Sequence, residues 1–397
     1  MTETQTGAAD VATIDEPTPD ELIARARAMI PALRARSADT EANRRVPQET
    51  IDELKANDLL RIATPRRWGG LGYDLEVVAR VAGEIARGCG STGWLTSFWA
   101  THNYMVGWWS EEAQAEYFAD GPQQLSSTVS AIVTCNAEME PDGLHISGRW
   151  KFSSGIDEAQ WILLLAPAGN CLIPRSEFVI EDDWYVSGLR GSGSKSIVIE
   201  GTVVPHHRLL SHEDLAAGSY PGAQLYDSPW YHVSRPQFMV LGHFILAPIL
   251  GIAQGIVDLF DERIRERRDP QTMLPAIERE ANQLRYAEAT VKLLTAQLLY
   301  ERNFADLRRW GTERAQLTVE QRAYIRRNLT YARKLAIEVG NSLIDGADSS
   351  ALYEVHQLHR LGRDLRGAGL QFTLFWEEAA IQYSRVTWGM EPQTIVI

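Results

Sequence analysis

The clearest chemical pattern in the chain lies between Gly148 and Trp161, where a strand-like run breaks into a polar bend. Trp150 and Phe152 place aromatic faces beside the hydroxyls and backbone N–H groups of Ser153-Ser154-Gly155. This combination fits a flat ring with polar edge atoms, because aromatic faces stack on the ring and hydroxyls bond its rim. Taken alone, a structural turn with Trp150 in the core is the more common meaning of such a pattern.

A second candidate lies in the apolar, aromatic segment 94–109, which contains His102 followed by Asn103. A histidine can accept or hold a proton near neutral pH, and this would activate a phenol or an indole N–H. On an apolar helix a histidine is as often a buried structural residue. The segment therefore offers one candidate acid-base group, which Asn103 is placed to share.

No metal site is predicted. Adjacent histidines on an extended chain point to opposite faces, and no pair of cysteines has the spacing of a zinc site. The cysteines are odd in number and widely separated, which favours free thiols in a reducing compartment. The residues concerned are His206, His207 and His212 and Cys89, Cys135 and Cys171.

Composition describes an ordinary globular protein. The chain has 397 residues, of which 45% are apolar and 23% charged, enough for two or three core-bearing units. A net charge of −13 argues against nucleic-acid binding. No run reaches the roughly 20 apolar residues of a membrane span, and the first 18 residues do not read as a secretory leader. We expect a cytoplasmic protein without a membrane or nucleic-acid partner.

Periodicity divides the chain into parts and predicts an α+β fold. A leader without periodicity is followed by amphipathic helices, by about six or seven short strands of a β-barrel or sandwich, and by a Gly/Ser/Pro-rich connector. Four long helical segments, about 235–268, 276–304, 318–345 and 349–388, then favour a four-helix bundle. The expected boundaries are 1–16 for the disordered leader, 17–121 for the helical domain, 122–212 for the β domain, 213–229 for the connector and 230–397 for the bundle.

This order of parts resembles the acyl-CoA dehydrogenase fold and, within it, the two-component flavin-dependent monooxygenases called group D. The likeness covers the chain from about residue 18. Each of the stretches that carry it is weakly specific alone, but together and in order they are distinctive. They are Trp68–Tyr73, Gly93–Leu95 with His102, Ser147–Gly155, and Gly188–Lys195 followed by Val203–Pro205.

The resemblance implies an oxygenase component that receives reduced flavin, FADH2 or FMNH2, from a separate flavin reductase. With O2 and no metal it would form a C4a-hydroperoxyflavin and hydroxylate a small aromatic or heteroaromatic substrate, in natural-product biosynthesis or aromatic catabolism. It also implies a homotetramer or homodimer. No nicotinamide-binding Gly-x-Gly-x-x-Gly follows a strand, which agrees with reduction elsewhere.

Three alternatives stay open: an acyl-CoA dehydrogenase-type flavoenzyme, an N- or S-oxygenase of the same fold, and a flavin-binding protein without turnover. Dehydrogenases of this fold commonly carry their base in a Tyr-Glu-Gly-Thr-like turn late in the chain. Here the last turn reads Thr387-Trp-Gly-Met-Glu-Pro392, and Glu377 and Glu378 fall within a helix. The sequence therefore favours the oxygenase.

The resemblance also implies roles for individual residues. The hydroxyl or amide of Ser154 would lie near the flavin N5 and C4a edge, Phe152 or Trp150 would lie against the ring, and His102 with Asn103 would contact the substrate. Gln371 stands where the family often has a second histidine, and it cannot serve as a general base near neutral pH. Further flavin contacts are implied for Ser153, Arg190, Gly191, Ser192, Arg263 at the phosphate, and Ser130, with which Ser126 and Ser127 compete.

Overall fold

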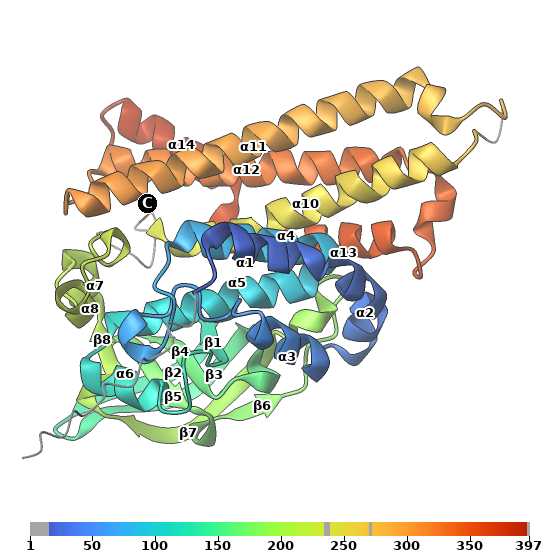
Figure 1. The fold of residues 1–397 in the computed structure, drawn as a ribbon. Helices are drawn as coiled ribbons and strands as arrows, with labels where there is room; N and C mark the ends of the chain where they lie inside the picture. The colour runs from blue at the N-terminus through green and yellow to red at the C-terminus, as the bar shows by residue number, and fades with distance from the viewer. Residues whose placement is uncertain (1–15, 234–238, 270–271, 395–397) are drawn as a thin grey trace, which may run out of the picture.

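The computed structural model describes residues 16–233, 239–269 and 272–394. Figure 1 shows the C-terminal helices packed on one side of the helices α4 and α5, and the β domain on the other. The predicted order of helical part, β part and helical bundle is confirmed. The predicted leader, apart from Glu16, lies outside the described residues.

The N-terminal part is built from amphipathic helices around a shared core. Thr18 begins the first helix with a capping box to Glu21, which satisfies its free N–H groups. The helical run is interrupted at Met29, and a new helix starts at Ile30 with Pro31 in its first turn, where a proline is tolerated. The helices are α1 Pro19–Ala28, α2 Ile30–Asn43, α3 Gln48–Ala56, α4 Leu75–Gly88, α5 Gly90–Met105 and α6 Glu111–Tyr117.

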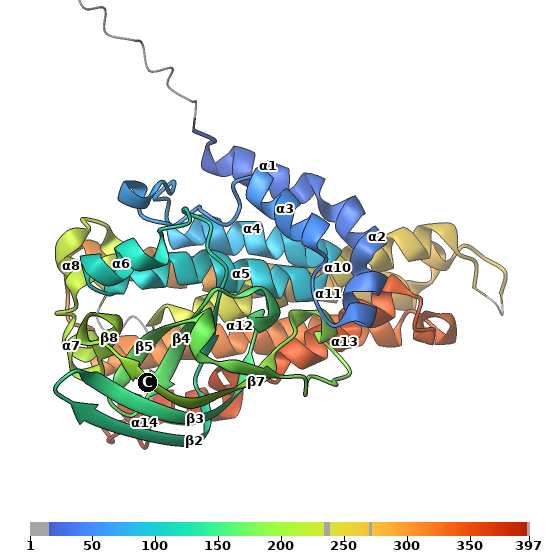
Figure 2. The same cartoon turned by 90° about the horizontal axis from the view of Figure 1, so that it is seen from below.

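The β domain is a sandwich of two four-stranded sheets, with strand orders β1-β4-β5-β8 and β2-β3-β7-β6. The run from Leu125 to Thr134 contributes to two strands that belong to different sheets, and the segment 184–189 contains no strand. The strands are β1 Ser126–Val129, β2 Ala131–Glu140, β3 Gly143–Ser153, β4 Trp161–Ala166, β5 Gly169–Pro174, β6 Val179–Glu181, β7 Lys195–Val204 and β8 Leu209–Ser211. Figure 2 shows β2 and β3 as the outer edge of this domain.

The stretch predicted as an irregular connector contains two short helices, and the bundle follows it. The fourth bundle helix, predicted to run from 349 to 388, is wrong as a single helix. Three glycines in 362–369 weaken the helix there, and the Gln371 side chain accepts the backbone N–H of Thr373 and starts a separate turn. The helices are α7 His212–Ala217, α8 Pro221–Leu225, α10 Leu241–Glu266, α11 Glu280–Thr312, α12 Val319–Asp345, α13 Gln357–Gly369 and α14 Trp376–Thr387.

Helix α10 is apolar along most of its length. Among the described residues, its segment Gly242–Glu266 is the one helix long and apolar enough to cross a membrane by length and composition. However, 83% of its most apolar window is buried inside the protein, against α4 and α5 on one side and the bundle on the other. Its composition is therefore that of a core helix.

Candidate active site

One face of α5 carries three aromatic rings in a row. Trp94, Phe98 and His102 are spaced four residues apart, so they share a face of the helix. The ring centroids of Trp94 and Phe98 lie 5.1 Å apart, and those of Phe98 and His102 lie 5.6 Å apart, edge to face. Within α5, Phe98 alone is not buried. The aromatic row therefore faces the one partly open point along an otherwise enclosed helix.

A chain of three serines lies at the Trp94 end of this row. The indole Nε1 of Trp94 donates to Oγ of Ser154 at 3.2 Å, and Ser154 Oγ lies 2.8 Å from Ser194 Oγ. Ser194 Oγ in turn lies 2.7 Å from Ser192 Oγ, and all of these side chains are buried. We call Ser154, Ser194 and Ser192 the serine chain. It joins the polar bend after β3 to the loop 188–195.

The backbone also ties these two segments together. The N–H of Gly155 donates to the carbonyl of Ser192 at 2.8 Å. Gly155 has a φ of 71°, and a Cβ at this position would lie 2.8 Å from Nε1 of Trp99. At Gly191 a Cβ would lie 2.3 Å from Cγ2 of Thr40. Only glycine fits at either position, so the sequence needs both glycines to bring the bend and the loop together.

Three buried donors at this junction lack a hydrogen-bond partner within the described part of the chain. They are Oγ of Ser153, Nε1 of Trp99 and Nε of Arg190. Ser153 is 0% exposed. Buried polar groups in proteins are almost always paired, because leaving one unpaired costs about 1–3 kcal/mol. The unpaired donors therefore indicate where a bound molecule would offer acceptors.

At the other end of the aromatic row, both ring nitrogens of His102 are engaged. Nδ1 lies 2.8 Å from the carbonyl oxygen of Ser126, and Nε2 lies 2.5 Å from Oγ1 of Thr128. A carbonyl only accepts, so Nδ1 carries the proton and Nε2 accepts from the threonine hydroxyl. Burial lowers the pKa of His102 from 6.5 to about 4, so the imidazole is neutral.

The chain is similar to known flavin-dependent hydroxylases along most of its length. Residues 20–120 match the N-terminal domain of acyl-CoA dehydrogenases, and residues 243–374 match their C-terminal domain. The oxygenase subunit HsaA of a flavin-dependent monooxygenase from Rhodococcus jostii is 29% identical, over 91% of this chain and 97% of that protein. The oxygenase component of an FADH(2)-dependent resorcinol hydroxylase from a Rhizobium species is 27% identical, over 94% and 95%. The crystal structure of 3-HSA hydroxylase from a Rhodococcus species superposes with a TM-score of 0.88 at 28% identity, covering 95% and 99%.

The chain belongs to the flavin-dependent monooxygenases of the acyl-CoA dehydrogenase fold. The enzyme uses reduced flavin and O2. The residues at the junction of bend and loop fit the flavin ring, since Ser153, Trp99 and Arg190 present unpaired donors to a molecule whose edge is rich in acceptors. The close backbone approach at Gly155 and Gly191 is consistent with a thin, planar ligand.

Several residues that the sequence singled out as flavin contacts are engaged elsewhere. Trp150 is fully buried in the sandwich core, and its indole donates to the carbonyl of Leu165 at 3.0 Å, so it packs in the core. Phe152 is 60% exposed and meets the ring of Trp184 edge to face. Ser130 is exposed between β1 and β2. Of the aromatic pair, Phe152 alone is free to lie against a ligand.

The buried Asn103 has a structural role in the fold. Its amide nitrogen donates to the carbonyl of Leu60 at 3.0 Å, and its amide oxygen accepts from Tyr117 at 2.9 Å. These bonds join α5 to neighbouring segments of the N-terminal part. The structure thus turns Asn103 away from the His102–Thr128 pair, although the two residues are adjacent in sequence.

Gln371 and Arg263 also lie apart from the aromatic row. The Gln371 side chain caps the turn before α14, and no contact joins it to His102 within the described residues. Arg263 lies near the end of α10, where it binds the carbonyl of Ala347 at 3.0 Å, Nε2 of His356 at 2.9 Å and Asp348 at 3.2 Å. Both proposed roles stay predictions.

The sequence contained signals for functional residues that were not singled out. Thr128 shares a face of β1 with Ser126, and strand alternation places both toward α5. Phe98 follows from the four-residue spacing between Trp94 and His102. Ser194 had no such signal, because its contact with Ser154 joins residues forty positions apart.

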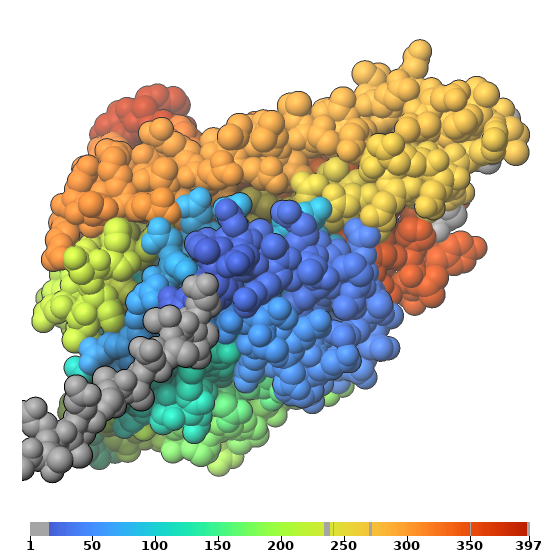
Figure 3. Space-filling model, viewed as in Figure 1, coloured from blue at the N-terminus to red at the C-terminus, as the bar shows by residue number. Residues whose placement is uncertain are grey.

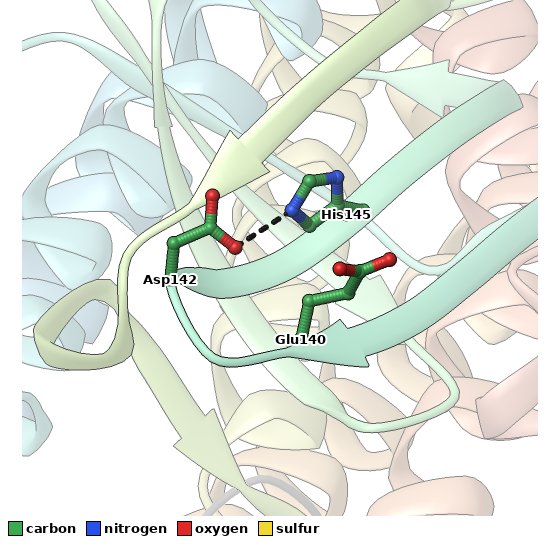
Figure 4. A group of neighbouring side chains, drawn as sticks. All are labelled: Glu140, Asp142 and His145. Carbon is green, nitrogen blue, oxygen red and sulfur yellow. Dashed lines mark hydrogen bonds and ion pairs between the residues drawn. The ribbon is translucent and has the colours of Figure 1, made fainter.

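The β2–β3 hairpin brings together the side chains of Glu140, Asp142 and His145 (Figure 4). Their ligand atoms lie close enough to approach one ion, but two of the three side chains are exposed. Asp142 and His145 pair with each other at 2.8 Å, which raises the pKa of His145 and lowers that of Asp142. We interpret the group as a surface ion pair.

Proposed function

We propose that the enzyme hydroxylates a small aromatic substrate of the phenol or indole type. The observation that carries the proposal is the aromatic row on α5, which joins the serine chain at Trp94 to the His102–Thr128 pair. A rise of 1.5 Å per residue separates the two polar ends by about 12 Å. That length accommodates one or two fused rings between the flavin edge and the imidazole.

The surroundings favour an aromatic substrate over an acyl chain. Trp94 and Phe98 offer flat apolar faces, and aromatic pairs gain about 0.5–1.5 kcal/mol beyond the area they bury. Phe98 is the partly open residue, which gives a substrate a place to stack. One of the relatives is a resorcinol hydroxylase, and resorcinol is a phenol, so we extend that substrate class to this enzyme.

Reduced flavin supplies the chemistry with oxygen, and the protein positions the reactants. Ser153 and Ser154 would hold the edge of the flavin ring, and the buried helices keep water away from it. Thr128 and His102 would bind the hydroxyl or N–H of the substrate. This binding turns the ring so that its electron-rich carbon faces the flavin.

The pKa values decide what His102 can do. Burial lowers the pKa of His102 to about 4, far below the usual pKa of a phenol, so the imidazole is too weak a base to take the phenol proton completely. His102 therefore acts as a hydrogen-bond acceptor for the substrate, directly or through the Thr128 hydroxyl, and does not store its proton. A hydrogen bond that draws the proton away still makes the ring more electron-rich.

We also propose an assembly of two or four copies through α11. Leu284, Val291, Leu294 and Leu298 form a stripe along this helix and are 53–72% exposed. A furrow of about 530 Å³ runs beside the stripe between α11 and the N-terminal helices, and Leu294 lines it (Figure 3). Exposed apolar rows of this length are typical of protein interfaces. The flavin reductase would be a separate protein, and we expect both in the cytoplasm.

The function is tested by incubating the enzyme with a flavin reductase, NADH, FAD or FMN, and a panel of phenols and indoles under ¹⁸O2. We expect one ¹⁸O atom in the aromatic product and, in rapid mixing, a transient absorbance that differs from both reduced and oxidised flavin. A thioether and a tertiary amine are included as further substrates, and labelled sulfoxide or N-oxide from these, without labelled phenol or indole products, would instead support the S- or N-oxygenase. Bleaching of bound oxidised flavin by an acyl-CoA, without any oxygenated product, would overturn the proposal.

A further inference from the structure

Helix α13 of the bundle holds the loop that leads into the serine chain. The N–H of Leu189 donates to Oδ1 of Asp364 at 2.7 Å, and Nε of Arg363 donates to the carbonyl of Ser187 at 3.0 Å. Between them, a Cβ on Gly188 would lie only 2.0 Å from the carbonyl oxygen of Arg363. Three consecutive loop residues therefore lie directly on one turn of α13.

Asp364 is an unusual residue for such a place, because it is an acid with only 6% of its surface exposed. Burial raises the pKa of its carboxyl to about 7. The carboxyl also lies against the start of α5, where a Cβ on Gly90 would be 2.6 Å from Oδ2. Burying an acid costs free energy unless hydrogen bonds compensate for the lost contact with water. The bond that Asp364 accepts from the Leu189 N–H is therefore expected to have a role in the fold.

The charged groups around Asp364 come from two helices. Arg360 and Arg363 lie on α13, one turn away or less, and both bind Glu41 of α2, Arg360 at 2.9 Å. The single charge of Glu41 offsets part of the charge of the two arginines, and their attraction for Asp364 does not undo the effect of burial. Asp364 is therefore not held in place as a member of an ion pair.

The backbone conformation of Leu189 explains why the hydrogen bond to Asp364 is needed. Its φ of 52° lies in the left-handed region, which a branched side chain adopts at a cost of about 1–2 kcal/mol. The next residues form the turn Arg190–Ser192, whose last member bonds Ser194 and accepts from Gly155. Releasing Leu189 would let this turn relax and would move the serine chain away from the bend after β3.

We propose that Asp364 is a positioning residue, which holds Leu189 in its left-handed conformation and so fixes the turn 190–192 and the serine chain against the flavin. The bundle thereby sets the geometry of a cofactor loop that belongs to the β domain. The inference rests on the proposed location of the flavin at the serine chain, but the loop ordering does not depend on turnover.

The test compares Asp364→Ala, which removes the acceptor, with Asp364→Asn, which keeps an oxygen for the Leu189 N–H. Hydrogen exchange of the flavin-free protein is measured over residues 187–194, together with the Kd for reduced flavin under anaerobic conditions. For Asp364→Ala we expect faster exchange confined to this loop and about tenfold weaker flavin binding. For Asp364→Asn we expect both values near those of the wild type.

Two further variants guard against misfolding. Arg363→Met removes the bond to Ser187 together with the contacts to Glu41 and His359. It leaves the Asp364–Leu189 bond in place, so we expect a smaller change in the same loop. Arg385→Met, which removes an equivalent arginine-to-carbonyl bond on α14, should leave the loop unchanged. Exchange that rises equally throughout the chain in Asp364→Ala, or an Asp364→Asn variant as impaired as the alanine, would overturn the proposal. If exchange in the loop becomes faster while the Kd for reduced flavin does not change, Asp364 holds the loop but the flavin binds elsewhere. This result distinguishes a failure of the proposed flavin location from a failure of the proposed role of Asp364.

Discussion

Nε2 of His102 accepts a hydrogen bond from the Thr128 hydroxyl at 2.5 Å, while the carbonyl of Ser126 holds the proton on Nδ1 at 2.8 Å. One tautomer is thus fixed, and Thr128, which is only half-buried, stands between the imidazole and the more open part of the site. Of these two residues, the sequence analysis singled out His102 and not Thr128. The pair is the unit that we expect to meet the substrate.

Replacing Thr128 by valine keeps the shape of the side chain and removes the hydroxyl. Because the substrate proton would lose its link to His102, we expect kcat for a phenol to fall about tenfold to a hundredfold. Steady-state product formation, with hydrogen peroxide measured beside it, checks this. Thr134→Val, at an exposed position on β2, is the matched control. A Thr128→Val enzyme with full activity would contradict the assignment.

His102 also makes stability depend on pH. Its pKa is about 4 when folded and 6.5 when exposed, so the unfolded chain takes up a proton between these values and the native protein does not. Stability therefore falls as the pH drops from about 6.5 to about 4, by roughly 3 kcal/mol from this residue. Urea unfolding of the wild type and His102→Gln should show that this part of the acid loss is absent in the variant. His243, whose pKa is lowered to about 3, contributes with the same sign in both proteins.

Shortening Phe98 tests the aromatic row. We expect Phe98→Ala to raise KM for an aromatic substrate about tenfold, since stacking on its ring is worth about 1 kcal/mol and the cavity adds to the loss. The Kd for reduced flavin should stay unchanged. Phe372→Ala, at a position 61% exposed, is the control. Equal losses of flavin and substrate affinity would show that Phe98 supports the fold and not the substrate.

Removing one hydroxyl of the serine chain should uncouple the oxidation of reduced flavin from the formation of hydroxylated product. Ser194→Ala leaves Ser154 and Ser192 without their common partner, at a cost of about 1–3 kcal/mol if neither finds another. We expect reduced flavin still to be oxidised, with more of the oxygen released as hydrogen peroxide. The ratio of product to flavin oxidised measures this. Ser147→Ala, on the outer part of β3, should leave the ratio unchanged.

Charges placed on the α11 stripe should weaken the assembly. We expect Val291→Lys with Leu294→Lys to reduce the molar mass measured by light scattering after gel filtration, because two cations would have to be buried in the interface. The conservative pair Val291→Leu and Leu294→Met is the control. An unchanged mass would show that these copies meet through another surface, or not at all.

The sequence alone was sufficient for the order of the parts and for much of the local structure. Periodic apolar residues predicted the amphipathic helices and alternating residues predicted a β-barrel or sandwich, because these signals act over a few neighbouring positions. Family resemblance added the flavin and the oxygenase reaction. The broken last helix was missed because a stretch of apolar spacing continues across 370–375, where only the side-chain cap of Gln371 shows the interruption.

Tertiary structure decided which residues form the site. Trp150 and Ser153 are three positions apart on β3, yet Trp150 packs in the sandwich core and Ser153 keeps an unpaired hydroxyl, because the pairing of β3 with β7 shifts register between them. The contacts of Ser154 with Ser194 and of Leu189 with Asp364 join residues 40 and 175 positions apart. Burial and hydrogen-bond partners belong to the folded arrangement of α5, the β domain and α13, and no local pattern of residue types encodes them.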